Sequence, residues 1–242
     1  MHEQPTVGDA GPTSTRTVDR ALRLLITVLE GSTGGTLTEL SRSTALSPST
    51  ASRLLGTMAA HHLVRRDETG RYRAGIRMMQ LAATTLREDP LYDLVGGHLT
   101  ALAEETGETA LLGVASSTDQ VLYLRQASSP RQEVQTADWT GRTIPREGTA
   151  LGAALNGTPS PRGYLTSLRP GSDVIAVAVP LIGHSGQIVA AISINAPVYR
   201  TAEPDIERLG HALMRHATAI SAALGAPARQ AGAPASPASP LG

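Results

Sequence analysis

Apolar residues recur at helical spacing in three segments near the start of the chain. They occupy positions 18, 21, 22, 24, 25, 28 and 29, then 37 and 40, and then 51, 54, 55 and 58. Spacings of three and four residues place side chains on one face of a helix. The pattern therefore predicts three helices in this part of the chain, of which the second is short.

Residues typical of helix ends separate these segments. The sequence from Thr36 to Glu39 has the form of a capping box, and Ser47 followed by Pro48 is typical of an N-cap and a first helical residue. A tight link, Ala45-Leu46, connects the second helix to the third. A short helix, a tight link and a helix that begins on a cap are typical of a helix-turn-helix.

A hairpin follows the third helix. The segments 63–66 and 71–73 flank the sequence Asp67 to Gly70, which is typical of a hairpin turn. Helices and hairpin together predict a winged helix-turn-helix. The wing carries Arg65, Arg66, Arg71 and Arg73, which we expect to contact phosphates or a minor groove.

The third helix has the chemistry of a recognition helix. Its first turns present small hydroxyl donors and Arg53, which can reach a guanine edge or a phosphate in the major groove. Taken singly, such a helix start is also typical of a plain cap, and an arginine-rich hairpin of a solvated sheet edge. Their order within one basic segment favours double-stranded operator DNA as a partner. The candidate DNA contacts are Thr36, Ser47, Ser49, Thr50, Ser52, Arg53, Arg65, Arg66, Arg71 and Arg73.

The second half of the chain has a different pattern. A helix is expected from Pro90 to Gly107, and a final helix from Pro204 to about Leu224. Short strand-like segments lie between them, at 109–114, 121–124, 134–137, 174–179 and 188–195. This order predicts an α+β domain with a mostly antiparallel sheet flanked by helices, and not a βαβ array.

These patterns divide the chain into five expected parts. They are a disordered leader (1–15), a winged helix-turn-helix domain (16–75), a linker helix (76–89), a second domain (90–224) and a disordered tail rich in Ala, Pro, Gly and Ser (225–242).

Composition narrows the class of protein. The 21 basic residues, all arginine, balance 21 acidic ones, but the first 86 residues hold ten arginines against seven acids, so only this part favours a polyanion. The absence of cysteine excludes disulfides, thiolate metal sites and a cysteine nucleophile. No apolar run approaches the ~20 residues of a membrane span. We therefore expect a soluble, cytoplasmic protein with no membrane partner, no metal and no cofactor.

The first half resembles the DNA-binding half of the IclR family of bacterial transcription regulators. The resemblance is carried by Val18 to Leu22, Leu37 to Leu40, Ser47 to Leu55 and Tyr72 to Gly75. It implies a homodimer or tetramer on a pseudo-palindromic operator, with the linker helix helping dimerisation. Ala45 departs from the glycine common in this turn, and alanine should be tolerated if its φ stays negative.

The resemblance continues through Gly107 to Ala110, Pro145 to Gly152 and Val189 to Asn195. It implies a GAF-like domain, in which a sheet with helices around it forms a cup for a small-molecule effector. The unpaired N–H groups of Thr149, Ala150 and Leu151 at a helix start, with the hydroxyl of Thr149, would suit a carboxylate. The candidate effector-binding residues are Glu147, Thr149, Ala150, Leu151, Ala176, Ser193 and Asn195.

Departures from the family pattern bear on the ligand. Glu147 stands where many members have histidine, Ala153 stands where many have lysine, and the stretch 154–163 is shorter than usual. Glu147 would favour a ligand with an amine, such as an amino acid, unless it only stabilises the helix dipole. Trp139 either lines the pocket or packs in the core.

Two other functions remain as alternatives. The sequence Gly183 to Gln187 is similar to the nucleophile elbow of a serine hydrolase, but Gln187 replaces the last glycine, and the position between strand-like segments favours a hairpin turn. We therefore expect no enzyme. The shortened second half leaves open a DNA-binding regulator whose second domain only dimerises, without a ligand.

Overall fold

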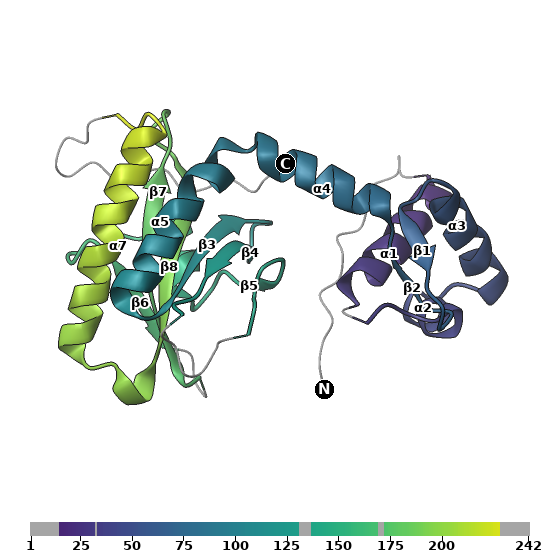
Figure 1. Cartoon of the computed structure of the whole chain (residues 1–242), viewed down its shortest axis with the longest axis horizontal. Helices are drawn as coiled ribbons and strands as arrows, with labels where there is room; N and C mark the ends of the chain where they lie inside the picture. The colour runs from purple at the N-terminus through teal and green to yellow at the C-terminus, as the bar shows by residue number, and fades with distance from the viewer. Residues whose placement is uncertain (1–14, 32, 131–136, 169–171, 228–242) are drawn as a thin grey trace. The chain divides into compact units, whose positions relative to one another are not determined.

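The structure is a computed structural model that describes residues 15–31, 33–130, 137–168 and 172–227 (Figure 1). Contacts between Cα atoms divide the chain into two compact units, Met1–Glu88 and Asp89–Gly242. Nearly all of the expected leader and tail, and most of the strand expected at 134–137, lie outside the described residues. Within the described ranges, no helix is both long enough and apolar enough to cross a membrane.

Three helices and a two-stranded hairpin form the body of the first unit, as the sequence predicts. Their apolar faces meet in one core that contains Leu24, Leu40, Leu55 and Val64. The elements of this unit are α1 (Arg16–Glu30), α2 (Leu37–Ser43), α3 (Pro48–Ala60), β1 (Val64–Arg66), β2 (Tyr72–Ala74) and α4 (Ile76–Glu88).

Helices α2 and α3 begin at the cap residues that the sequence predicts, and local hydrogen bonds form both caps. The side chain of Thr36 accepts from the Glu39 N–H at 3.3 Å, and Glu39 Oε2 accepts from the Thr36 N–H at 2.8 Å. Ser47 Oγ accepts from the Thr50 N–H at 3.2 Å. Ala45 differs from expectation, because its φ is +53° and not negative. It occupies the position after the end of α2, where the chain reverses and glycine is the usual residue.

A six-stranded antiparallel sheet organises the second unit, with the order β5-β4-β3-β8-β7-β6. The sequence predicts the four inner strands but misses β5 and β6, which are short and pair with one neighbour each. The elements are α5 (Pro90–Thr106), β3 (Thr109–Ala115), β4 (Gln120–Ala127), β5 (Thr143–Pro145), α6 (Ala150–Leu155), β6 (Leu165–Leu168), β7 (Val174–Ile182), β8 (Ile188–Pro197), the 3₁₀ turn η1 (Val198–Arg200) and α7 (Glu203–Ala223).

The two faces of this sheet have different covers (Figure 1). The long helices α5 and α7 pack on one face, with Leu99 and Leu213 fully buried beneath them. The short helix α6 packs on the other face together with Trp139. Successive residues of β3 serve both covers, since Leu112 belongs to the α5–α7 side and Leu111 to the α6 side. Among the described residues, the α6 side has the smaller cover, because the helix that packs there is short.

Candidate nucleic-acid interface and ligand cavity

The first turns of α3 present a polar surface with little bulk. Ser49, Ser52 and Arg53 are exposed and lie three and four residues apart, so they share a face of the helix. Gly56 and Thr57 are exposed too and extend this face toward the end of the helix. A helix with such a face can enter the major groove of B-DNA closely.

The predicted hydroxyl groups have different surroundings. Ser47 Oγ donates to Thr50 Oγ1 at 2.8 Å and lies 3.1 Å from Ser49 Oγ, so these groups build the cap of α3. The side chain of Thr36 caps α2 in the same way. Ser52 and Arg53, in contrast, have no side-chain partner among the described residues and face solvent.

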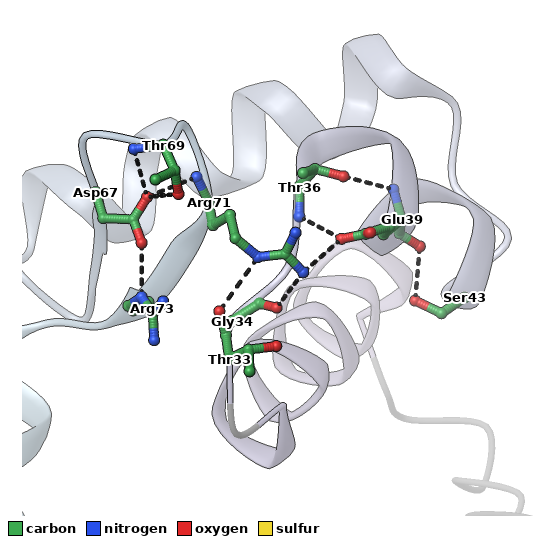
Figure 2. Close-up of polar contacts among 9 residues, drawn as sticks. All are labelled: Thr33, Gly34, Thr36, Glu39, Ser43, Asp67, Thr69, Arg71 and Arg73. Atoms are coloured by element: carbon green, nitrogen blue, oxygen red, sulfur yellow. Dashed lines mark hydrogen bonds and ion pairs between the residues drawn. The ribbon is translucent and has the colours of Figure 1, made fainter.

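Asp67 organises the turn of the wing (Figure 2). Its Oδ1 accepts from the N–H groups of Thr69 and Arg71, each at 3.0 Å, and its Oδ2 accepts from Arg73 Nε at 2.6 Å. The hydrogen bonds from Arg73 and then Thr69 hold the pKa of Asp67 well below its ordinary value. The turn therefore closes around a charged carboxylate.

The four predicted wing arginines differ in their contacts. Arg65 is exposed and makes no hydrogen bond or ion pair with another described side chain. Arg66 donates to a carbonyl of the wing turn at 3.2 Å. Arg71 and Arg73 each pair with a carboxylate, at 3.0 and 2.6 Å. Among the candidate arginines that the structure describes, Arg53 and Arg65 alone lack a partner inside the unit.

A cavity of about 130 Å³ lies on the α6 side of the sheet in the second unit. Its walls combine aromatic and apolar side chains with hydroxyl and amide groups, and no charged side chain of the described residues lines it. The lining residues are Thr109, Leu111, Tyr123, Trp139, Ile144, Thr149, Ala150, Leu151, Ser167, Ser172, Val174, Ala176 and Asn195.

The structure brings some of the predicted effector-binding residues together and leaves two apart. Glu147 is exposed and does not line the cavity. Ser193 is fully buried in the middle of β8, between Leu111 and Ala178, and does not line it either. The residues that do line the cavity are Thr149, Ala150, Leu151, Ala176 and Asn195.

The start of α6 already has partners within the protein. The N–H of Ala150 donates to Ser167 Oγ at 2.8 Å. Thr149 Oγ1 accepts from the Gly152 N–H at 3.1 Å and lies within donating distance of the Pro145 carbonyl, also at 3.1 Å. Two of the donors expected to receive a carboxylate here, the Ala150 N–H and the Thr149 hydroxyl, are therefore used by the fold itself.

Asn195 is the lining residue with an unsatisfied atom. Its Oδ1 is buried and has no hydrogen-bond partner among the described residues. Burying an acceptor without a donor is costly, so this atom favours a ligand that supplies one. Asn195 comes from β8, in register with Ala176 of β7 and Thr109 of β3, so the sheet itself places it.

Sequence reasoning missed part of the aromatic wall. Trp139 both packs on the core and lines the cavity, with its ring edge-on to Tyr123 at a centroid distance of 6.0 Å. The strand expected at 121–124 could have pointed to Tyr123, because alternate residues of a strand share a face and Tyr123 then lies beside Val121. Ser167 gives no such signal, because β6 is an edge strand of four residues.

Segments in both halves of this chain match models of known protein families. The family model of the IclR helix-turn-helix domain matches residues 17–68, and that of the bacterial transcriptional regulator IclR C-terminal domain matches residues 171–222. The HTH-type transcriptional regulator XynR of Escherichia coli is 26% identical over 250 residues, which cover 88% of this chain and 98% of XynR.

Solved structures share the fold. A putative IclR transcriptional regulator from a Silicibacter species superposes with a TM-score of 0.74 at 23% identity, covering 88% of this chain and 98% of that one. An IclR homologue from Microbacterium hydrocarbonoxydans, complexed with 4-hydroxybenzoate, superposes with a TM-score of 0.70 at 23% identity, covering 86% of this chain and 98% of that one.

Proposed function

The chain belongs to the IclR family of bacterial transcription regulators, and we propose that it recognises its operator with the exposed face of α3 and with the wing. The observation that carries this proposal is the surface of Ser49, Ser52 and Arg53, which is polar and solvent-facing and joins two small side chains to one long cationic one. Arg53 is the residue best suited to a base edge, because it lies on α3 and its guanidinium has no partner among the described residues.

Substitution of Arg53 tests this assignment. Arg53→Ala should cost about 1–3 kcal/mol of operator binding and relax specificity at one base position, measured by titrating DNA variants at fixed salt. Arg208→Ala in α7 removes the same charge from the second unit and should leave binding unchanged. Parent-like affinity and specificity in the Arg53 variant would show that another surface reads the DNA.

The cavity beneath α6 is the proposed effector site. Its neutral, partly aromatic lining and the buried Oδ1 of Asn195 suit a small molecule with a flat apolar body and at least one hydrogen-bond donor. The Microbacterium homologue binds 4-hydroxybenzoate, which has both features. We therefore favour a small hydroxylated aromatic compound over an amino acid, since Glu147, the residue expected to attract an amine, lies outside the cavity.

Thermal unfolding with candidate ligands tests the effector site. A ligand at 100 times its Kd should add about 2.7 kcal/mol of stability, visible as a higher Tm. Hydroxylated aromatic carboxylates should raise the Tm of the parent and of Glu147→Gln, but not that of Asn195→Ala. A Tm that no compound raises would favour the alternative, in which the second unit serves dimerisation alone.

We also propose that a second copy of the chain covers α1. Val18, Leu22, Ile26 and Leu29 follow one another at intervals of three and four residues, and all four are exposed. Helix α4 has no buried residue in the part of the chain that the structure describes, and its Ile76 is exposed. Apolar stripes of this kind mark surfaces that another protein covers.

A further inference from the structure

The guanidinium of Arg71 lies between the wing and the start of α2 (Figure 2). Its Nε donates to the carbonyl of Thr33 at 3.2 Å, and its Nη2 donates to the carbonyl of Gly34 at 2.9 Å and to Glu39 Oε2 at 3.0 Å. Arg71 follows the wing turn, whereas its three acceptors lie more than thirty positions earlier in the chain. One side chain thus bridges β2 and the loop that leads into α2.

Glu39 is a shared acceptor in this contact. The Oε2 atom that receives Arg71 also receives the N–H of Thr36 in the capping box of α2. The hydrogen bonds from Thr36, and then the charge of Arg71, lower the pKa of Glu39 below its ordinary value. Glu39 is therefore ionised at neutral pH, and its attraction for the guanidinium persists there.

The backbones of β2 and of the loop before α2 also contact each other beside Arg71. Gly35 and Tyr72 exchange two hydrogen bonds, at 2.8 and 3.1 Å, as an isolated antiparallel bridge. The approach is close enough that a Cβ added to Gly34 would lie 2.4 Å from the carbonyl oxygen of Tyr72. The bridge and the Arg71 contacts together hold β2 against the loop before α2.

Arg71 and Arg73 therefore have different structural roles. Arg73 closes the wing turn on itself through Asp67, whereas Arg71 connects the wing to another element. The Nε and Nη2 groups of Arg71 already donate to two carbonyls and to a carboxylate that neutralises the guanidinium, so a phosphate would meet a charge that is already paired. Arg65, with no such contacts, has its charge available.

We propose that Arg71 is a positioning residue, which holds the wing against the start of α2 so that the wing and α3 meet one DNA duplex together. This inference rests on the proposed function for its effect on DNA. It assigns to Arg71 a contact within the protein in place of a phosphate contact.

The test compares Arg71→Lys, Glu39→Gln and the double variant. Lysine keeps the charge but cannot reproduce the planar fork, so Arg71→Lys should lower operator affinity by about threefold to tenfold. Glu39→Gln removes a negative charge, which by charge alone should strengthen DNA binding. The proposal predicts that Glu39→Gln instead lowers operator affinity. It also predicts that the affinity of the double variant is no lower than that of the weaker-binding single variant.

Two matched controls separate charge from position. Glu68→Gln removes an exposed acid of the wing turn that has no internal contact, and should leave affinity equal or higher. Arg65→Ala should weaken binding and reduce the slope of log affinity against log salt by about 0.9. The slope of Arg71→Lys should stay that of the parent.

Amide hydrogen exchange of the DNA-free protein gives an independent readout. The Gly35 and Tyr72 amides should exchange faster in Arg71→Lys and in Glu39→Gln, and at the parent rate in Arg65→Ala and Glu68→Gln. The exchange rates test the positioning role even if the parent protein binds no duplex. Failure of the parent to bind duplex DNA would overturn the proposed function and not the positioning role. Parent-like affinity in Arg71→Lys together with unchanged exchange would overturn the positioning role and favour a phosphate contact.

Discussion

Ala45 has a strained backbone conformation at the end of α2 in the N-terminal unit. The Leu46 N–H donates to the Ser41 carbonyl at 3.0 Å and the Ala45 N–H to the Arg42 carbonyl at 3.3 Å, which is the hydrogen-bond pattern of a helix end that turns through the left-handed region. With φ at +53°, alanine bears a cost of about 1 kcal/mol there that glycine would not. The link between α2 and α3 therefore follows the geometry of the turn and not the preference of its residue.

Gly56 presents the opposite case, a glycine that the fold does not need. It lies in the middle of α3, and a Cβ built on it would meet nothing within 4 Å. Glycine inside a helix costs about 0.5–1 kcal/mol relative to alanine. Because Gly56 lies three residues from Arg53 on the exposed face, close approach of DNA would explain why the position has no side chain.

We predict that Gly56→Ala stabilises the protein by about 0.5–1 kcal/mol and yet weakens operator binding about tenfold or more, by costing one close contact. Chemical unfolding and DNA titration would measure the two effects. Gly97→Ala in α5, where a Cβ would also meet nothing, should stabilise equally and leave DNA binding unchanged. Tighter or equal DNA binding by the Gly56 variant would contradict the prediction.

At the scale of elements, a histidine pair joins the two helices that cover one face of the sheet. His98 Nδ1 of α5 and His216 Nδ1 of α7 lie 2.9 Å apart, which requires one ring to donate and the other to accept. Glu105 faces His216 at 3.6 Å and also pairs with Arg215. Burial, and then the charge of His98, lowers the pKa of His216 below its ordinary value of 6.5.

This shift has a definite sign for stability. A histidine with a lowered pKa in the fold binds its proton more tightly when unfolded, so stability is lost as the pH falls through about 6.5. The Tm of the parent should therefore fall between pH 7.5 and 5.5. His216→Gln should flatten this dependence, whereas His211→Gln, an exposed position on the same helix, should retain it. Equal slopes in the parent and His216→Gln would refute the role of the pair.

At the scale of the whole molecule, the proposed dimer would connect the exposed stripe of α1 with DNA recognition. Leu22 and Ile26, at its centre, are 53% and 46% exposed in the single chain. A two-fold dimer would cover them and would present two copies of α3 to the half-sites of a palindromic operator. Loss of the dimer should then reduce operator affinity without any change at the reading surface.

We predict that Leu22→Asp with Ile26→Asp yields a folded monomer by light scattering, with operator affinity close to that for a single half-site. Val189→Asp places one aspartate on an exposed apolar position of β8 and should remain assembled. A double variant that keeps the parent mass and affinity would place the dimer contact elsewhere.

The sequence predicts a structural feature best when the residues that form it are close together in the chain. Thr36 and Ser47 bond to groups three residues away, so their caps are visible in the sequence. The hairpin around Asp67 is visible for the same reason. The edge strands β5 and β6 are not, because three or four residues carry too little alternation to predict a strand.

The sequence by itself determined the helices and caps of the N-terminal unit, the inner strands of the sheet and the family, since each rests on spacing or on motifs of neighbouring residues. Only the tertiary structure decided that Arg71 meets Thr33, Gly34 and Glu39, and that Glu147 stays outside the cavity that Asn195 enters. These facts depend on which distant segments the fold brings together, and side-chain chemistry alone does not choose among the many partners that a long chain offers.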